Sequence, residues 1–262
     1  MVAAREDILK IDSLFKFFGK LPALQHVSFV VQQGSITSVI GPNGAGKTTL
    51  FNVITGHLSA DGGEVIFKGK DITNFPPHRV NRMGLSRSFQ IVNIFPRFTV
   101  FENVHASIIS KMRRNSSLTT SLHDMGEEEA FSILQKVGLS AHAGTVAGTL
   151  SYGDQRILEI AIALGSSPEL LLLDEPTAGM GPEETKSTVE LIKRLVTELG
   201  LTVLIVEHDM DVVFSISETI IVLHQGMVLA QGEPDEVRHN EMVQKVYLGE
   251  EIDHVKEVYV PE

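Results

Sequence analysis

Nine consecutive residues carry the most specific chemistry in this sequence. They match the spacing G-x-x-x-x-G-K-[ST] at every fixed position and read Gly41-Pro42-Asn43-Gly44-Ala45-Gly46-Lys47-Thr48-Thr49. Closely spaced glycines let backbone N–H groups turn inward around phosphate oxygens, and a helix N-terminus adds partial positive charge. We expect Lys47 to reach the β- and γ-phosphates of a nucleotide and the Thr48 hydroxyl to ligate Mg²⁺.

The flanking residues should position this loop. Residues 35–40 predict a buried strand, and residues 47–55 predict the start of a helix, so the glycines fall where a strand turns into a helix. The alternative is a glycine-rich turn that binds nothing. It leaves both the fixed positions and this setting unexplained.

An acidic pair follows the most apolar run of the chain. Residues 170–173 are four leucines, which predict a parallel strand covered on both faces, and Asp174 and Glu175 come directly after them. A carboxylate at the C-terminal end of such a strand suits Mg²⁺ bound through water, the role we expect for Asp174. Glu175 should point the other way and polarise the water that attacks a γ-phosphate, unless it is simply solvated.

Composition limits the classes of protein to consider. The 262 residues suit one large domain, or one domain with an inserted subdomain. A net charge of −11 without a long Lys/Arg run argues against nucleic acid as a partner. The absence of cysteine excludes disulfides and fits a reducing cytosol. Apolar runs are too short to span a bilayer, so any membrane association should be peripheral.

The pattern along the chain predicts an α/β fold with a helical interruption. We expect β-structure over residues 7–31, a hairpin after a turn at 61–63, and a strand over 84–90 that ends at Gln90. Residues 91–151 are predicted to be largely helical, with a solvated loop at 111–121. Residues 182–199 predict a helix whose buried stripe includes Leu199. Strands at 201–206, 219–223 and 227–230 and a helical tail from Pro234 complete the prediction.

Phe17-Phe18-Gly19 predicts an aromatic pair in a turn. One ring could stack on a purine, for which we choose Phe18, or both could belong to ordinary core packing.

The order of these motifs resembles that of the ATP-binding-cassette (ABC) ATPases over nearly the whole chain. The resemblance rests on the phosphate loop, Gln90, the signature run Leu150-Ser151-Tyr152-Gly153-Asp154-Gln155-Arg156, the pair Asp174-Glu175, and His208. It implies a single ATPase domain over residues 1–262. Within it, a P-loop NTPase core with a mainly parallel sheet and an antiparallel β flank would take residues 1–90 and 158–232. The inserted helical subdomain would take 91–157, and the C-terminal helical tail 233–262.

The resemblance also implies roles that the residues would not carry alone. Gln90 would ligate Mg²⁺ and water, and His208 would contact the γ-phosphate of ATP. Ser151 Oγ and the Gly153 N–H would hold the γ-phosphate bound to a second chain, so that ATP is sandwiched in a dimer of identical or different chains. Taken alone, Gln90 and His208 could be ordinary structural residues, and Ser151 could be only a helix N-cap.

Three positions depart from the family pattern. Tyr152 and Asp154 stand at the third and fifth positions of the usual Leu-Ser-Gly-Gly-Gln signature, and Gly181 stands where Asp is common. Ser151 and Gly153 should keep the phosphate contact. A contact through the signature Gln side chain, and coupling through the missing Asp, are not carried over to this chain.

Several segments are similar to the ATPase subunits of branched-chain amino-acid importers: residues 88–90, 94–104, 177–182, 207–214 and 246–249. The implied partners are transmembrane permease subunits, a second ABC ATPase chain and, indirectly, a solute-binding protein. The implied location is peripheral, on the cytoplasmic face of the inner or plasma membrane. Urea or amide importers and lipopolysaccharide exporters use similar segments, so the cargo, its direction, the identity of the second cassette and the hydrolysis rate stay open.

Apolar residues after Gln90 could form a docking groove for a cytoplasmic helix of a permease, or the core of the helical subdomain; they are Ile91, Val92, Ile94, Phe95 and Phe98. A cassette ATPase that acts on ribosomes or DNA is disfavoured by the single cassette, the acidic charge and the lack of a coiled-coil or basic insertion. A GTP-dependent switch protein is disfavoured because no Asn-Lys-x-Asp run occurs.

Overall fold

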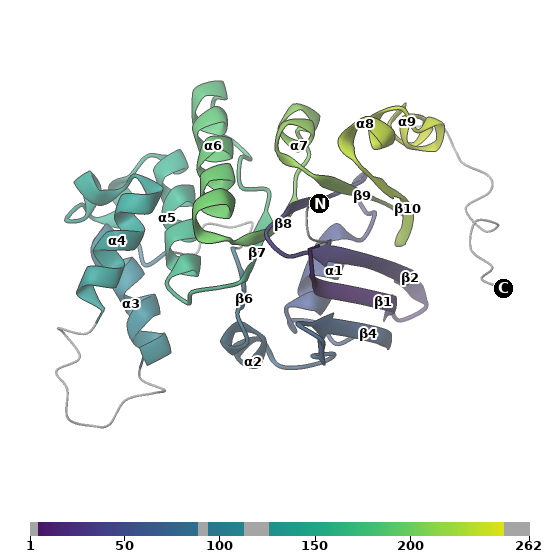
Figure 1. Cartoon of the computed structure of the whole chain (residues 1–262), viewed down its shortest axis with the longest axis horizontal. Coiled ribbons are helices and arrows are strands. Elements are labelled where there is room, and N and C mark those ends of the chain that lie inside the picture. Colours follow the sequence, from purple (N-terminus) through teal and green to yellow (C-terminus); the bar gives the residue numbers. More distant parts are fainter. Residues whose placement is uncertain (1–4, 89–93, 113–125, 249–262) are drawn as a thin grey trace. The chain divides into compact units, whose positions relative to one another are not determined.

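The computed structural model describes residues 5–88, 94–112 and 126–248, and the chain divides into two compact units (Figure 1). Unit 1 comprises residues 1–75 and 204–262, and unit 2 comprises residues 76–203. The elements of unit 1 are β1 (Asp7–Phe18), β2 (Leu21–Gln32), β3 (Ile36–Ile40), α1 (Lys47–Ile54), β4 (Gly62–Phe67), β5 (Lys70–Asp71), α7 (Met210–Ile216), β9 (Thr219–His224), β10 (Met227–Gly232), α8 (Pro234–Arg238) and α9 (Glu241–Leu248).

Unit 2 contains the helical part of the chain. Its elements are α2 (Pro77–Arg82), β6 (Leu85–Arg87), α3 (Val100–Met112), α4 (Glu127–Val137), the short 3₁₀ turns at Ser140–His142 and Ala147–Thr149, α5 (Tyr152–Leu164), β7 (Leu170–Asp174) and α6 (Pro182–Leu199). Strand β8 (Thr202–Val206) contains the boundary between the units.

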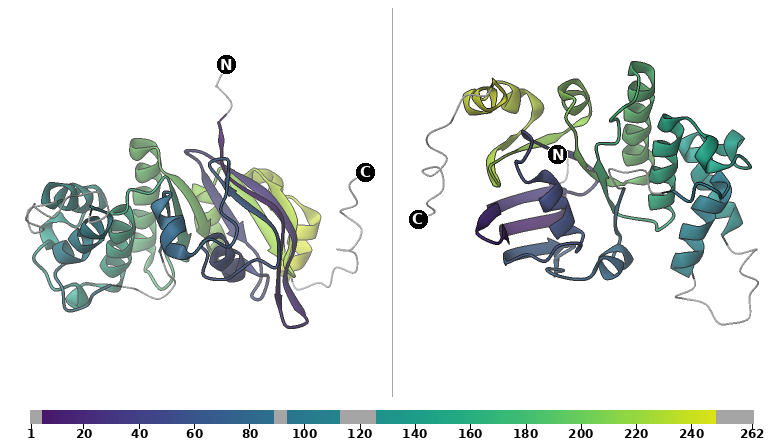
Figure 2. Two further views of the ribbon diagram at one scale, coloured as in Figure 1. Left: turned by 90° about the horizontal axis from the view of Figure 1, so that it is seen from below. Right: turned by 180° about the vertical axis from the view of Figure 1, so that it is seen from behind.

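The antiparallel sheet of unit 1 has the strand order β2-β1-β4-β5. Strands β1 and β2 form a long hairpin that is visible in both views of Figure 2, with Leu9 opposite Val31 and Ile11 opposite Phe29. The alternation in β2 buries Val27, Phe29 and Val31 on one face, as the period of two in the sequence predicts. The predicted antiparallel flank is therefore present.

A second group of strands in unit 1 leads to the phosphate loop. β3 runs parallel to β9, which pairs with β10 in an antiparallel hairpin. All five residues of β3 are buried, as the sequence predicts. Ile40, the last of them, belongs to a core cluster with Val222 of β9, Val237 of α8 and Val243 of α9. Figure 1 shows α8 and α9, in yellow, beside β10. The C-terminal helices thus pack on the strands that carry the loop.

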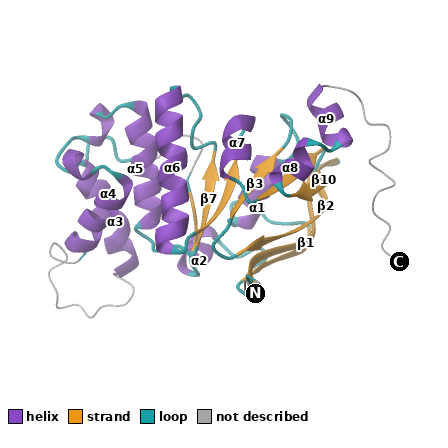
Figure 3. Ribbon diagram, turned by 45° about the horizontal axis from the view of Figure 1, so that its top comes forward, coloured by secondary structure: helices purple, strands orange, loops and turns teal. Residues whose placement is uncertain are grey.

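In unit 2, β6 and β7 form a parallel pair with Arg87 opposite Leu172. Helices α3, α4 and α5 contact one another, and α6 runs beside α5 (Figure 3). The predicted periodicity of α4 is confirmed, because Ala130, Ile133, Leu134 and Val137 are buried, and Gly138 ends the helix in the left-handed conformation.

Several boundaries differ from the sequence prediction. Phe17 and Phe18 lie in β1 rather than in a turn, because the hairpin pairing continues to Phe18 opposite Leu21 and leaves only two residues for the turn. The expected turn residues Gly62 and Gly63 belong to β4. Leu199 is 42% exposed because it is the last residue of α6, where the buried stripe ends.

Some predictions fall on residues that the structure does not describe. They include Gln90, Ile91 and Val92, and most of the predicted solvated loop at 111–121, of which Lys111 lies in α3. Among the described residues, no helix combines the length and the apolar composition needed to cross a bilayer.

Candidate nucleotide site

The phosphate loop joins the end of β3 to the start of α1 in unit 1. At Gly41 the backbone has a φ of +148°, and a Cβ would lie 2.1 Å from the carbonyl oxygen of Leu223 in β9. At Gly46, the N-cap of α1, φ is +103° and a Cβ would lie 2.6 Å from the Ala23 carbonyl oxygen. Only glycine fits at these two positions. At these two glycines, the loop backbone therefore packs directly against the main chain of Leu223 and Ala23.

Lys47 is 7% exposed and stays inside the loop. Its Nζ donates to the carbonyl oxygens of Gly41 at 2.7 Å and Pro42 at 3.1 Å. These carbonyls satisfy a buried ammonium that would otherwise be costly to desolvate. Thr48 is exposed in the first turn of α1, so its hydroxyl is accessible to a ligand.

Tyr247 of α9 also reaches the loop. Burial raises the pKa of the Tyr247 hydroxyl to about 12, and a hydrogen bond with the backbone of Gly41 lowers this pKa by less. Tyr247 keeps 42% of its surface exposed, so the residue is only partly covered.

Two more predicted site residues lie in unit 1. His208 is exposed in the segment between β8 and α7, and its backbone N–H donates to Glu207 Oε2 at 3.1 Å. Phe18 is 49% exposed at the end of β1, with Lys16 Nζ 5.8 Å from the ring centroid. Exposure leaves the Phe18 ring available to stack on a base, whereas core packing, the alternative interpretation, does not apply to a ring that is half in solvent.

In unit 2, Asp174 ends β7 as predicted, and Glu175 follows it. Asp174 is 1% exposed, and its Oδ2 accepts a hydrogen bond from the Arg87 guanidinium at 2.7 Å. Glu175 is half-buried and has a φ of +50°, which is uncommon for a residue with a side chain. The sequence analysis did not single out Arg87. Its place in the predicted strand over residues 84–90 was visible, but the pairing of that strand with the leucine strand was not.

The signature run lies at the start of α5, where its side chains cap the helix. Ser151 Oγ accepts a hydrogen bond from the Asp154 N–H at 3.1 Å and donates to Asp154 Oδ2 at 2.9 Å. The predicted N-cap is therefore confirmed, and Asp154 has a local role as its partner. A Cβ at Gly153 would lie 2.9 Å from Glu184 Oε1, so the Glu184 carboxylate of α6 lies beside this glycine.

Tyr152 has a structural explanation as well. Its ring lies 5.4 Å from the Arg156 guanidinium, and a Cβ at Gly179 would lie 3.3 Å from the ring edge. Arg156 pairs at 3.1 Å with Glu159, and both residues are almost fully buried. The aromatic ring at the third signature position thus covers a buried ion pair that the sequence analysis missed.

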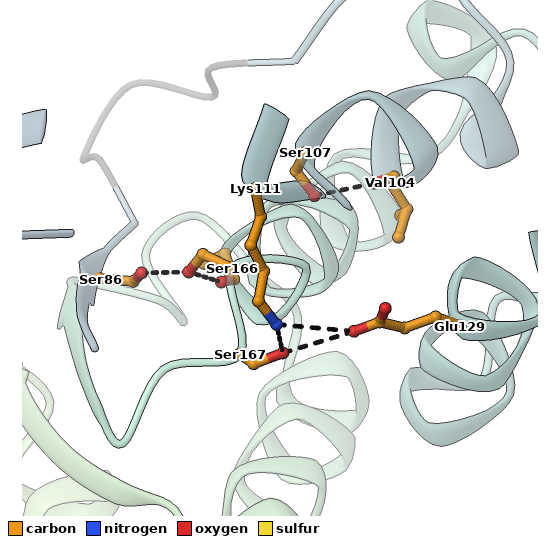
Figure 4. A network of polar contacts seen from close by, with 8 residues as sticks. Ser86, Val104, Ser107, Lys111, Glu129, Ser166 and Ser167 are labelled. Carbon is orange, nitrogen blue, oxygen red and sulfur yellow. Dashed lines mark hydrogen bonds and ion pairs between the residues drawn. The ribbon is translucent and has the colours of Figure 1, made fainter. Parts of the chain in front are cut away.

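Gln90 and the residues up to 93 lie outside the described part of the chain. The strand that precedes them is held by a polar network in unit 2 (Figure 4). Ser86 Oγ lies 2.5 Å from Ser166 Oγ, and Lys111 Nζ donates to Ser167 Oγ at 2.6 Å, beside Glu129. This network joins β6, α3, α4 and the segment between α5 and β7.

Residues 24–178, which include the phosphate loop, the signature run and the acidic pair, match the family "ABC transporter". The chain belongs to this family. As an ABC transporter cassette, it binds ATP and hydrolyses it for transport. Residues 227–253, which contain β10, α8 and α9, match the family "Branched-chain amino acid ATP-binding cassette transporter".

Curated relatives cover nearly the whole chain. The branched-chain amino acid transport ATP-binding protein LivG of Salmonella typhimurium is 40% identical over 252 residues, which are 94% of this chain and 99% of LivG. BraF of Pseudomonas aeruginosa, described in the same words, is 41% identical over 250 residues, 93% of this chain and 98% of BraF.

Solved ABC cassettes share the fold. A nucleotide-free cassette superposes with a TM-score of 0.83 at 33% identity, and a cassette in its ADP conformation with 0.82 at 35%. Each covers 94% of this chain and 100% of its own. The predicted fold class is therefore confirmed: a P-loop fold with a mainly parallel sheet, an antiparallel β subdomain and a helical subdomain.

The side chains present fit magnesium chemistry. Mg²⁺ prefers oxygen ligands and keeps several waters, usually with one or two carboxylates and the phosphates of the substrate. The exposed Thr48 hydroxyl in unit 1 and the Asp174 carboxylate in unit 2 are each oxygen groups of this kind. The described residues contain no cluster of three acidic or histidine side chains able to hold a metal without a nucleotide.

Proposed function

We propose that this chain is the ATP-hydrolysing subunit of an importer for branched-chain amino acids, bound peripherally to permease subunits on the cytoplasmic face of the membrane. The observation that carries the proposal is the pair of relatives at 40% and 41% identity, both described as branched-chain amino acid transport proteins. The match of residues 227–253 to a branched-chain cassette family supports it independently of the general ATPase motifs.

Each of the predicted site residues has a separate role in the proposed hydrolysis. In this proposal the amides of residues 41–49 surround the phosphates, Lys47 leaves its carbonyl partners to neutralise the β- and γ-phosphates, and Phe18 stacks on the adenine. Glu175 polarises the attacking water, and His208 contacts the γ-phosphate. Thr48, Asp174 and Gln90 would hold Mg²⁺, which supplies charge neutralisation between the phosphates when bound.

The second half of each site would come from another cassette. Ser151 Oγ and the Gly153 N–H are proposed to meet the γ-phosphate held by the partner, because they sit at a helix N-terminus that favours anions. An ATP-binding cassette that is 28% identical to this chain, and that covers 86% of it, was solved as a dimer in a post-hydrolysis state bound to ADP and phosphate. Light scattering of Glu175→Gln protein with ATP and Mg²⁺ tests this step. A variant that stays monomeric even with its transporter partners present would refute it.

The permease is proposed to dock on aromatic residues at the start of the helical region. Phe95 and Phe98 are 56% and 46% exposed, with ring centroids 5.3 Å apart. The fully buried Asn103 holds the segment by hydrogen bonds with both the N–H and the carbonyl of Phe95. A rigid backbone that displays two apolar rings suits a partner helix. Phe98→Asp should weaken permease association and leave ATP binding intact, whereas equal loss of both would indicate a folding role.

Transport itself decides the cargo. The chain should be purified with its co-purifying membrane subunits from native membranes, reconstituted in vesicles with ATP outside, and supplied with labelled leucine and its solute-binding protein inside. ATP-dependent export of leucine from the vesicle lumen, which represents the outside of the cell, supports the proposal, and Glu175→Gln is the inactive control. Transport of urea, or co-purification with lipopolysaccharide-export subunits, would leave the ATPase standing and remove the branched-chain assignment.

A further inference from the structure

A buried arginine faces the acidic residue that we assign to magnesium. Strands β6 and β7 are parallel, with Arg87 opposite Leu172. Side chains two residues apart on a strand share a face, so Asp174 projects from the same face as Leu172 and lies diagonally next to Arg87. The register of the two strands therefore brings a cation to the carboxylate that ends β7.

The contact between the two side chains is close and almost dry. Arg87 Nη2 donates to Asp174 Oδ2 at 2.7 Å, and the side chains are 6% and 1% exposed. Among the described residues, the side chain that donates to this carboxylate is that of Arg87. Because one oxygen is occupied by the guanidinium, the other oxygen keeps its lone pairs for a second donor or for metal-bound water.

Arg87 is held in place by its neighbours along β6. Ser86 points to the opposite face, where its Oγ contacts Ser166 Oγ (Figure 4). The same Oγ accepts a hydrogen bond from Asn81 at 2.8 Å. On the other side, the Ser88 N–H donates to the Leu172 carbonyl oxygen at 2.9 Å. These contacts hold β6 on both sides of Arg87 and so fix the backbone from which its guanidinium extends.

We propose that Arg87 is a positioning residue for Asp174 at the magnesium site. It fixes Asp174 through Oδ2 and would leave Oδ1 for a metal-bound water, in the way that partners beyond the ligands orient the ligands of a metal. A planar guanidinium can hold a carboxylate in one orientation, whereas a lysine ammonium on a flexible stem cannot. The inference rests on the proposed role of Asp174 and goes beyond it, since nothing else assigns a function to Arg87.

The test compares magnesium requirement with nucleotide binding. Arg87→Lys keeps the charge but loses the planar fork, and Arg87→Gln keeps a donor without the charge. For both we measure ATP binding by calorimetry in EDTA, and then the Mg²⁺ concentration that half-saturates the additional, magnesium-dependent gain in ATP affinity. ATP affinity in EDTA should be unchanged, while the half-saturating Mg²⁺ concentration should rise roughly tenfold in Arg87→Lys and further in Arg87→Gln.

Arg156→Lys is the matched control, because Arg156 is also an almost fully buried arginine paired with a carboxylate in unit 2. It should lower the melting temperature without changing the magnesium requirement. A magnesium requirement equal to wild type in both Arg87 variants would leave Arg87 a purely structural residue and overturn the proposal. A lower requirement would also overturn it, since Arg87 would then compete with Mg²⁺ for Asp174. Wild-type protein that binds no ATP would contradict the ATPase assignment instead, so the two failures are distinguishable.

Discussion

The phosphate loop of unit 1 and the start of α5 in unit 2 are both expected to hold phosphate, but they are built by opposite means. The loop is made of main chain: glycines at positions 41 and 46 fit where a Cβ would collide with carbonyl oxygens, and Lys47 rests on two loop carbonyls. The start of α5 is made of side chains, because Ser151 and Asp154 cap each other and the Glu184 carboxylate lies beside Gly153.

This difference agrees with the state of the two motifs in this chain. A backbone site needs particular residue types at fixed spacing, so its motif is complete in this chain. A side-chain site can exchange partners, and here Tyr152 covers Arg156 while Asp154 bonds to Ser151. The two residues that depart from the usual signature therefore both have local contacts. Substitutions in the glycine loop and substitutions of capping side chains should therefore have different effects.

The largest effect should follow from Gly41→Ala. Its Cβ would lie 2.1 Å from the Leu223 carbonyl oxygen, and φ is +148°. Overpacking and backbone strain together should cost about 3 kcal/mol or more and abolish ATP binding. The measurements are thermal melting and ATP calorimetry. Gly34→Ala is the control, because it has a φ of +69° but nothing within 4 Å, and it should cost only about 1 kcal/mol and leave binding unchanged. Wild-type ATP affinity in Gly41→Ala would contradict the main-chain account.

The features that the sequence predicted correctly are local motifs and periodicities, whereas the features that it did not predict are contacts between distant segments. The glycine loop, the leucine strand before Asp174 and the stripe of α4 follow from motif spacing and periodicity, and the structure has them where expected. The pairs Arg87 with Asp174 and Arg156 with Glu159, and the contact of Tyr247 with Gly41, did not follow. The Arg87 and Tyr247 contacts depend on strand register and on helix docking, which a single sequence does not encode locally.

The end of β1 shows the same limit in a smaller way. Phe17 and Phe18 looked like turn residues because Gly19 follows them, but long-range pairing with β2 extends the strand to Phe18. Cross-strand pairing of this kind overrides local turn chemistry, since each added pair buries side chains or satisfies backbone groups.

Next in size is the effect of replacing Ser151. Ser151→Ala removes the cap of α5 and should cost about 1 kcal/mol of stability, with loss of ATPase activity but not of ATP binding. Ser151→Asn restores a capping side chain, so it should recover the melting temperature without recovering hydrolysis. Melting and steady-state ATPase assays of both variants separate the cap from the proposed phosphate contact. Full activity in Ser151→Asn would show that the serine is needed only as a cap.

A smaller effect should come from Tyr247→Phe, which removes the hydroxyl that contacts the backbone of Gly41. Losing one hydrogen bond of about 1 kcal/mol should weaken ATP affinity by up to roughly fivefold, without a change in kcat. Because the pKa of Tyr247 is raised to about 12, the phenol stays protonated and the difference should be constant from pH 6 to pH 9. Lys245→Ala, on the exposed side of α9, is the control. Unchanged affinity in Tyr247→Phe would confine α9 to packing.

The smallest effect concerns a side-chain acceptor at the hairpin that carries Phe18. The Asp61 carboxylate accepts hydrogen bonds from the Phe17 N–H at 2.6 Å and from Lys16 Nζ at 3.2 Å, and these contacts lower the pKa of Asp61 below 3.8. Since the folded protein holds the deprotonated form more firmly than the unfolded chain, the stabilisation is present above pH 3.8 and disappears as the pH falls through the lowered value. Asp61→Asn should therefore lower the melting temperature slightly at pH 7 and make it less sensitive to acid between pH 5 and pH 3. An identical acid dependence in both proteins would show that this carboxylate does not support the hairpin end, and the exposed Phe18 ring would then owe its position to strand pairing alone.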